Sequence, residues 1–251
     1  MSFVKWSGCG LLVFVFSSSG GAVAQTQLTR GPIVIKLQEG NDRWVAGKPL
    51  HANLDAARRK ATATEQKPIA TVLACSDSRV PVEAIFDLGI GDLVVVRVYG
   101  NVTGPSEIAS IEQGVGYLGT PMLIVLGHSS CSAAEAAIEK TPPPGALGEL
   151  IGRIKPSVED AQKGNPHLQG KYLLPAVVKF NVRKSMENLL RNSAEVRKQI
   201  ADLKLTMVGG IYDLETGKID WLGAHPDQTS ILQEAAGEKK PANPGEPKKD
   251  R

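Results

Sequence analysis

Residues 69–81 read IATVLACSDSRVP, an apolar run of strand length that ends abruptly in polar residues. Two more apolar runs of similar length follow, LVVVRV at 93–98 and MLIVL at 122–126. Continuous apolar runs of this length are typical of strands that are covered on both faces, as in a parallel sheet. A helical pattern over 106–118 separates the second run from the third. This alternation predicts right-handed crossovers and an α/β fold.

The rest of the chain supplies further helices and a hairpin. Apolar residues recur at helical spacing over 33–44, 147–161 and 176–190, and another helix is expected to start near Cys131. Residues 205–213 and 218–222 flank a hairpin-like turn. We therefore expect a single α/β domain with a central, mostly parallel β-sheet flanked by helices, and an N-terminal helical arm.

Potential metal ligands follow two of the predicted strands. Cys75 and Asp77 lie two residues apart at the end of the first, and His128 and Cys131 lie three apart at the end of the third. Ligands of open α/β sheets bind beyond the carboxyl ends of the strands, so these four side chains are expected to meet. Thiolates and imidazole are ligands that zinc prefers, and a carboxylate can serve as a fourth, displaceable one.

Other interpretations of the same residues remain open at this point. If the N-terminal segment that contains Cys9 is removed on export, as its pattern described below suggests, Cys75 and Cys131 are the only cysteines left, and two cysteines in an exported protein often form a disulfide. A lone cysteine is often a small buried hydrophobe, and a lone aspartate is often a turn former. The polar residues after both strands favour zinc, and Arg79 offers Asp77 a second partner. A metal site whose fourth ligand can leave is typical of a catalyst.

The first 24 residues have the pattern of an export signal. Lys5 is the only charge before Arg30, an apolar core (GLLVFVF) covers 10–16, and AVA at 22–24 fits a small-x-small cleavage site. The apolar core is too short to span a bilayer. Cleavage would remove Cys9, and we expect a periplasmic or secreted protein with no membrane attachment. The alternative is a buried first helix.

The charge and composition of the remaining residues limit the functions and the folded extent of the chain. The formal net charge is +3, and it becomes +2 without residues 1–24, which contain one lysine and no acid. A net charge this close to zero does not indicate a surface that attracts nucleic acid or an anionic membrane. Residues 235–251 are rich in Lys, Pro and Gly, and we expect a disordered tail there. The folded domain is thus expected over 25–234.

The motifs taken together resemble those of the β-class carbonic anhydrases. CSDSRVP at 75–81 and GHSSC at 127–131 are similar to the paired zinc signature of that family. GDLVVVRV at 91–98 and VGGIYDLETG at 208–217 are also similar, and the resemblance runs in the family's order from about 37 to 222. It implies reversible hydration of carbon dioxide to bicarbonate and a proton, with one Zn²⁺ per chain. It also implies a homodimer or a dimer of dimers.

The resemblance assigns roles to individual residues. Cys75, His128 and Cys131 would bind the zinc ion. Asp77 would either complete the ligand set or pair with Arg79, and the pair would then form a catalytic dyad that orients the nucleophile. Zinc lowers the pKa of water to about 7, which gives a nucleophile at physiological pH.

Three further residues resemble, by relative position, a bicarbonate regulatory pocket found in part of the family: Trp44, Arg97 and Tyr212. Each also fits a structural role, as helix core, buried hydrogen bonder and sheet edge. Two residues depart from the family pattern. Tyr99 stands where a small residue is expected, and Ser132 stands where glycine is usual, which leaves the turnover rate open.

Two rival functions share these motifs. An enzyme with the same fold and zinc site could hydrolyse carbonyl sulfide or carbon disulfide, because the substrate depends on the shape of the access tunnel. A non-catalytic module could instead hold Cys75 and Cys131 in a disulfide or a closed zinc knot. The remaining histidines, His51, His167 and His225, lie in polar or proline-flanked segments and are expected at the surface.

Overall fold

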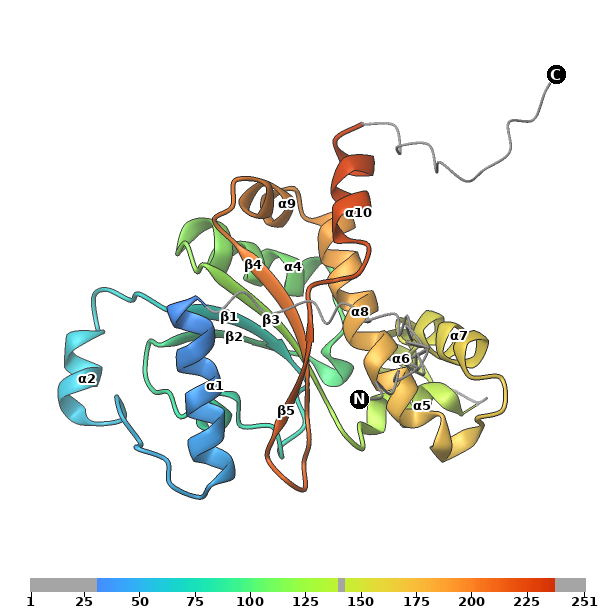
Figure 1. Cartoon of the computed structure of the whole chain (residues 1–251), viewed down its shortest axis with the longest axis horizontal. Helices are drawn as coiled ribbons and strands as arrows, with labels where there is room; N and C mark the ends of the chain where they lie inside the picture. Colours follow the sequence, from blue (N-terminus) through green and yellow to red (C-terminus); the bar gives the residue numbers. More distant parts are fainter. Residues whose placement is uncertain (1–30, 140–142, 238–251) are drawn as a thin grey trace, which may run out of the picture.

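The computed structural model describes residues 31–139 and 143–237, and in it helices cover both faces of a five-stranded sheet (Figure 1). The strand order is β2-β1-β3-β4-β5. The first four strands are parallel, and β5 runs antiparallel to β4. The strands are β1 (Ala70–Ala74), β2 (Leu93–Arg97), β3 (Met122–His128), β4 (Thr206–Tyr212) and β5 (Ile219–Gly223). The predicted α/β fold with a mostly parallel sheet is confirmed.

Helices of very different length connect these strands. The helices of the described residues are α1 (Pro32–Val45), α2 (Ala56–Ala61), α3 (Val82–Ile85), α4 (Pro105–Glu112), α5 (Ser132–Ile138), α6 (Gly145–Gly152), α7 (Lys155–Gly164), α8 (Leu174–Asn192), α9 (Ala194–Ala201) and α10 (Gln228–Ala235). Short 3₁₀ turns occur at Tyr99–Asn101 and Gly170–Tyr172, and a π-helical turn (Gln113–Tyr117) extends α4. None of the described helices has the length and apolar character that a bilayer crossing needs.

The two faces of the sheet belong to different parts of the hydrophobic core. Successive side chains of a strand point to opposite faces, and all of β1 is buried. Val72 packs in the cluster that contains Leu37 of α1. Its neighbour Leu73 packs in the cluster that contains Met186 of α8. Burial on both faces explains why β1 and β3 have continuous apolar sequences instead of alternating ones. The edge strand β2 was also expected to be covered on both faces, but it is only partly buried.

The order of the strands sets where the functional site can form. The chain passes from β1 outward to β2, and then returns to place β3 on the other side of β1. Crossovers leave in opposite directions from such a switch point, which opens a crevice at the carboxyl ends of the two strands. The stretches that follow β1 and β3 therefore lie side by side, although more than 45 residues separate them in sequence.

One predicted helix is in fact two. The periodic stretch 147–161 is divided between α6 and α7, with a turn at Arg153 and Ile154. Pro156 lies in the first turn of α7. Proline lacks an N–H and clashes with the preceding turn of a helix, so it fits the start of α7 but not the middle of one long helix.

The C-terminal part contains two helices that were not expected, α9 and α10. The disordered tail was predicted from residue 235, but Ala235 ends α10, which buries Ile231. The rest of the predicted tail, 238–251, and the predicted export signal, 1–24, lie outside the described residues. The other predicted helices and the hairpin agree with the structure within a few residues at their ends.

Candidate metal centre

Three buried side chains converge at the crevice between β1 and β3. The sulfur atoms of Cys75 and Cys131 and a ring nitrogen of His128 all lie within 4.8 Å of one another. Cys75 follows β1, and Cys131 precedes α5. His128 was expected just beyond its strand but is the last residue of β3, paired with Tyr212 of β4. Both cysteines are free thiols, which contradicts the disulfide interpretation.

The ring of His128 presents one free nitrogen to this cluster. Its Nδ1 lies 2.8 Å from the carbonyl oxygen of Ser129, a contact that requires the proton on Nδ1. Its Nε2 then carries a lone pair, and this fully buried atom has no hydrogen-bond partner. A buried acceptor without a partner is costly, unless a ligand or ion completes it. One imidazole oriented through its other nitrogen and two thiols make a donor set that fits Zn²⁺.

The two cysteines lie in different polar surroundings. Cys75 Sγ accepts a hydrogen bond from the backbone N–H of Gly100 at 3.2 Å. Without a metal, a hydrogen bond from Cys131 lowers the pKa of Cys75, and the same contact, together with burial, raises the pKa of Cys131. The pair therefore holds one thiolate readily and needs a cation to stabilise the second.

Asp77 lies beside the three converging side chains but is held by Arg79. Nε and Nη2 of Arg79 donate to Oδ1 and Oδ2 of Asp77 at 2.9 and 2.8 Å, and the backbone N–H of Arg79 also donates to Oδ1 at 2.9 Å. Hydrogen bonding by Arg79 is the main reason that the pKa of Asp77 is lowered. Oδ2 of Asp77 lies 3.9 Å from Nε2 of His128. The carboxylate thus borders the site without completing the ligand set.

The loop between β3 and α5 is fixed by the end of β4. The N–H of Ser129 donates to the carbonyl oxygen of Tyr212 at 2.9 Å, and Oγ of Ser129 accepts from the N–H of Leu214 at 2.9 Å. Ser130 has a φ of +51°, and its carbonyl oxygen faces Nη2 of Arg79 at 3.4 Å. The same loop therefore orients the imidazole and touches the guanidinium.

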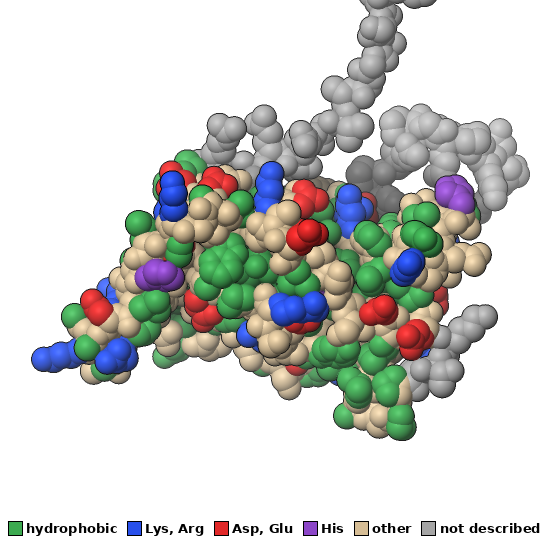
Figure 2. Space-filling model, turned by 90° about the horizontal axis from the view of Figure 1, so that it is seen from below, with side chains coloured by type: hydrophobic (Ala, Val, Ile, Leu, Met, Phe, Trp, Pro, Cys, Tyr) green, Lys and Arg blue, Asp and Glu red, His purple; other side chains and the backbone are tan. Residues whose placement is uncertain are grey.

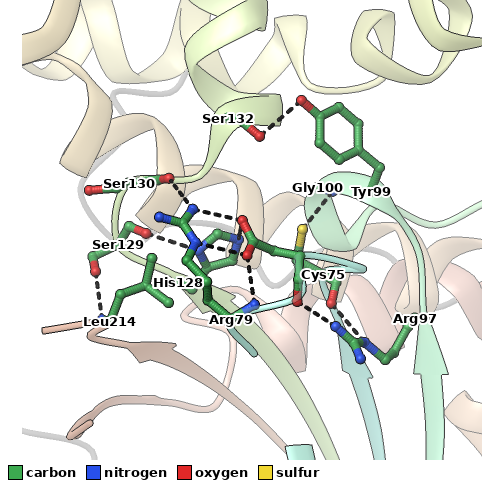
Figure 3. A network of polar contacts seen from close by, with 11 residues as sticks. Cys75, Arg79, Arg97, Tyr99, Gly100, His128, Ser129, Ser130, Ser132 and Leu214 are labelled. Atoms are coloured by element: carbon green, nitrogen blue, oxygen red, sulfur yellow. Dashed lines mark hydrogen bonds and ion pairs between the residues drawn. The ribbon is translucent and has the colours of Figure 1, made fainter. Parts of the chain in front are cut away.

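The two residues that depart from the family pattern contact each other. The phenol of Tyr99 donates to Oγ of Ser132 at 3.0 Å (Figure 3). Tyr99 follows β2 and adjoins Gly100, whereas Ser132 follows Cys131. The hydrogen bond therefore joins the turn whose Gly100 N–H bonds Cys75 Sγ to the start of α5, which follows Cys131. Tyr99 also packs against the core cluster that contains both cysteines.

The structure does not bring Trp44, Arg97 and Tyr212 together. Nε1 of Trp44 donates to the hydroxyl of Tyr212 at 3.2 Å. Arg97 ends β2, and its guanidinium donates to the carbonyl oxygens of Cys75 and Asp77 at 3.0 and 2.5 Å. Strands β1 and β3 lie between β2 and β4, a separation of about 14 Å at the usual strand spacing. Arg97 thus supports the backbone of the metal centre.

The other three histidines lie elsewhere. His51 and His167 are exposed, as expected. His225 was also expected at the surface but is only 8 % exposed, and its Nδ1 accepts the N–H of Asp227 at 3.1 Å. Burial lowers the pKa of His225. It serves as a neutral cap acceptor at the start of α10.

Comparison with known proteins agrees with this geometry. Residues 70–219 match the family model described as carbonic anhydrase. "Carbonic anhydrase 2" of Mycobacterium tuberculosis is 36% identical over 186 residues, which cover 72% of this chain and 87% of that protein. A tetrameric β-carbonic anhydrase from Sordaria macrospora superposes with a TM-score of 0.62 and 26% identity, covering 74% of this chain and 94% of that one.

A more distant structure shares the fold. The β-carbonic anhydrase of Coccomyxa, solved with acetazolamide, has a TM-score of 0.65 at 20% identity and covers 82% of this chain and 96% of its own. The family match spans the strands that carry both cysteines, the histidine and the Asp77–Arg79 pair. By its sequence and its fold, this chain belongs to the β-class carbonic anhydrases.

Proposed function

We propose that this chain hydrates carbon dioxide reversibly, with Cys75, His128 and Cys131 as the zinc ligands and Asp77 and Arg79 as the catalytic pair. The observation that carries the proposal is the free Nε2 of His128, buried among two thiols, while the neighbouring carboxylate is occupied by a guanidinium. A site with three protein ligands, whose neighbouring carboxylate is bonded to arginine and does not complete the ligand set, is arranged for catalysis and not for a closed structural knot.

Zinc bound at this site would supply a Lewis acid that makes water a nucleophile near neutral pH. The chain's own residues then orient the reaction. Asp77 remains ionised because Arg79 lowers its pKa, so its carboxylate can accept a hydrogen bond from a hydroxyl group beside the ligands. Two parallel N–H···O bonds from Arg79 fix the plane of that carboxylate and would keep it from becoming a fourth ligand of a bound metal.

Metal analysis and a hydration assay test this proposal together. The purified protein should contain one zinc per chain and should accelerate carbon dioxide hydration. Cys75→Ser and Cys131→Ser should each lose the zinc and the hydration activity, because the two strong donors that remain are too few for tight zinc binding. Exposed Ser110, bonded only within α4, provides a control through Ser110→Ala. Zinc-replete protein without hydratase activity would refute the catalytic role, and metal-free wild-type protein would refute the ligand set.

We infer that the chain assembles as a homodimer or a dimer of dimers. Support comes from large apolar side chains at the surface, among them Tyr172, which is 70% exposed. Tyr172 also lines an apolar hollow with Leu174, Pro175 and Val178, next to Ser129 of the metal-centre loop. Figure 2 shows hydrophobic side chains gathered at several places between charged residues on the lower face. Sedimentation velocity would reveal a monomer if the inference is wrong.

We also infer export to the periplasm or the medium, from the signal pattern in residues 1–24. Mass spectrometry of protein recovered from those compartments should find Gln25 as the first residue and no Cys9. A retained Met1 in a cytoplasmic fraction would contradict export.

A further inference from the structure

A single 3₁₀ turn separates the ligand Cys75 from helix α8. This turn, Tyr99–Asn101, follows β2, and its central N–H, that of Gly100, donates to Cys75 Sγ at 3.2 Å. A hydrogen bond to a thiolate withdraws part of its negative charge and fixes the direction of its lone pairs. The position of this one N–H therefore affects how the sulfur donates to a metal.

The carbonyl groups of the same turn are held from α8. Nδ2 of Asn181 donates to the carbonyl oxygen of Gly100 at 2.7 Å. Oγ of Ser185 donates to the carbonyl oxygen of Asn101 at 2.9 Å. Asn181 and Ser185 lie four residues apart, on one face of the helix, and are 3 % and 2 % exposed. These two buried polar side chains of α8 are thus directed at two consecutive peptide groups of the turn.

Packing prevents this turn from relaxing in other directions. Gly100 has a φ of +76°, and a Cβ atom there would lie 2.7 Å from Cδ1 of Ile154 and 2.9 Å from Cβ of Ala133. On the strand side, the N–H of Val98 donates to the carbonyl oxygen of Ala74 at 3.1 Å. The turn is confined between β1 and α5, and only α8 supplies side-chain hydrogen bonds to its carbonyl groups among the described residues.

We propose that Asn181, assisted by Ser185, is a positioning residue for the metal centre. It orients the peptide groups around Gly100 so that the N–H of Gly100 bonds the sulfur of Cys75. This inference rests on the proposed role of Cys75 as a zinc ligand. It assigns to α8, which contributes no ligand, control over the strength of one metal–sulfur bond.

A purely structural role is the alternative, and Asn41 of α1 is the matched control. Asn41 is 4 % exposed, donates to the carbonyl oxygens of Ile85 and Gly217 at 3.3 and 2.9 Å, and accepts the N–H of Ile219 at 3.0 Å. It is therefore an equally buried asparagine bonded to backbone, but it has no connection to the turn or to Cys75. Asn181→Leu and Asn41→Leu make the same chemical change at comparable burial.

Two measurements on full-length protein separate the two roles. Competition with a chelator gives the zinc dissociation constant, and Co²⁺ substitution gives the sulfur-to-metal charge-transfer band. Asn181→Leu should weaken zinc binding about 10- to 100-fold, the usual effect of losing a partner that orients a ligand. It should also move the band to longer wavelength, because the sulfur keeps more negative charge. Asn41→Leu should lower the unfolding temperature and leave both quantities unchanged.

Ser185→Ala removes a single hydroxyl group and provides a milder second variant if Asn181→Leu does not fold. It should change both quantities in the same direction by a smaller amount. Wild-type zinc affinity and an unshifted band in a folded variant of either residue would overturn the inference while leaving the proposed function intact. A wild-type protein that binds no zinc would overturn both.

Discussion

The contact between Arg79 and Asp77 depends on a geometry that only arginine has. Two donors of one planar guanidinium engage the two oxygens of one carboxylate, although the side chain of Arg79 is 54% exposed. Lysine would carry the same charge to the same place, but an ammonium group is a point charge and cannot fix the carboxylate plane. At the scale of a residue, the shape of the donor therefore matters more than its charge.

Replacing Arg79 should separate metal binding from catalysis. In Arg79→Ala, Asp77 loses the partner that holds it away from the ligands and becomes free to occupy the fourth position. We expect zinc content to stay at wild-type level and hydration to fall about 10- to 100-fold, as for other groups that orient a metal site. Arg79→Lys should give an intermediate rate. Metal analysis and stopped-flow hydration with a pH indicator measure both effects.

Arg191→Ala is a suitable control for this comparison. Arg191 is also exposed, at 47%, and pairs with Glu187 on the outer part of α8. Its removal should leave the hydration rate unchanged. A zinc-replete Arg79→Ala enzyme with the wild-type rate would show that the pair has no part in the reaction.

Among the elements, the strands were the most predictable. β1 and β3 are covered on both faces, so each needs an unbroken apolar sequence that is easily recognised. The candidate ligands Cys75, His128 and Cys131 follow from these strands, because parallel neighbours bring their carboxyl ends together. In contrast, the contact of Asn181 with Gly100 crosses 81 residues and leaves no local pattern. An amphipathic helix predicts which face is buried but not which backbone group a buried amide will bond.

Helices were harder to delimit where packing and local sequence disagree. The apolar spacing of 147–161 is continuous, yet Pro156 can only begin a helix, so α6 ends at Gly152 and α7 starts afresh. Ser193 ends α8 and caps α9 by accepting the N–H of Val196 at 3.0 Å. Serine is a common helix cap, but the backbone of Ser193 is extended between α8 and α9, and its hydroxyl also donates to Glu112 of α4 at 2.6 Å, a long-range contact that sequence periodicity does not contain.

A glycine within α1 offers a prediction at this scale. Alanine is normally the better helix former, by about 1 kcal/mol. Gly40, however, faces the backbone carbonyl of Phe86 so closely that a Cβ atom would overlap with it. Gly40→Ala should therefore push α1 off the sheet and lower the free energy of unfolding by about 1–3 kcal/mol, the usual cost of overpacking.

Gly152 provides the opposite case for comparison. It ends α6, and a Cβ atom there would have no neighbour within 4 Å. Gly152→Ala should raise stability by up to about 1 kcal/mol. Urea unfolding of both variants shows whether Gly40→Ala lowers and Gly152→Ala raises the free energy of unfolding. An equal gain in stability from both substitutions would mean that α1 does not pack against α3 as the structure has it.

In the molecule as a whole, the buried carboxylate of Asp87 helps to attach the N-terminal arm, α1 and the segment after it, to the α/β body. Asp87, at the end of α3, accepts Nε of Arg43 at 2.6 Å and the N–H groups of Leu50 and His51 at 2.9 and 3.0 Å. Its side chain is 1 % exposed. Helix α1 and the segment that follows it are thereby bonded to the same two oxygen atoms.

This attachment should make the stability of the whole chain dependent on pH. Burial disfavours the charged form of Asp87, but hydrogen bonds from Leu50, Arg43 and His51 outweigh burial, so its pKa is lowered. A folded-state pKa below the unfolded value of about 3.9 means that this stabilisation is complete above about pH 5. It is lost as the pH falls through the folded-state pKa, where the folded carboxylate takes up its proton.

Asp87→Asn isolates this contribution from the other effects of acid. The variant should lose about 1.5–3 kcal/mol of stability at neutral pH, the range for hydrogen bonds to a charged group. The difference from wild type should stay constant above about pH 5 and shrink below about pH 4. Loss of zinc in acid affects both proteins alike and cancels in this difference. Asp42→Asn makes the same change in charge on the exposed side of α1 and should cost little at any pH. Urea unfolding of the three proteins between pH 3 and pH 7 provides the measurement. A difference that does not change down to pH 3 would show that Asp87 does not couple proton binding to the attachment of the arm.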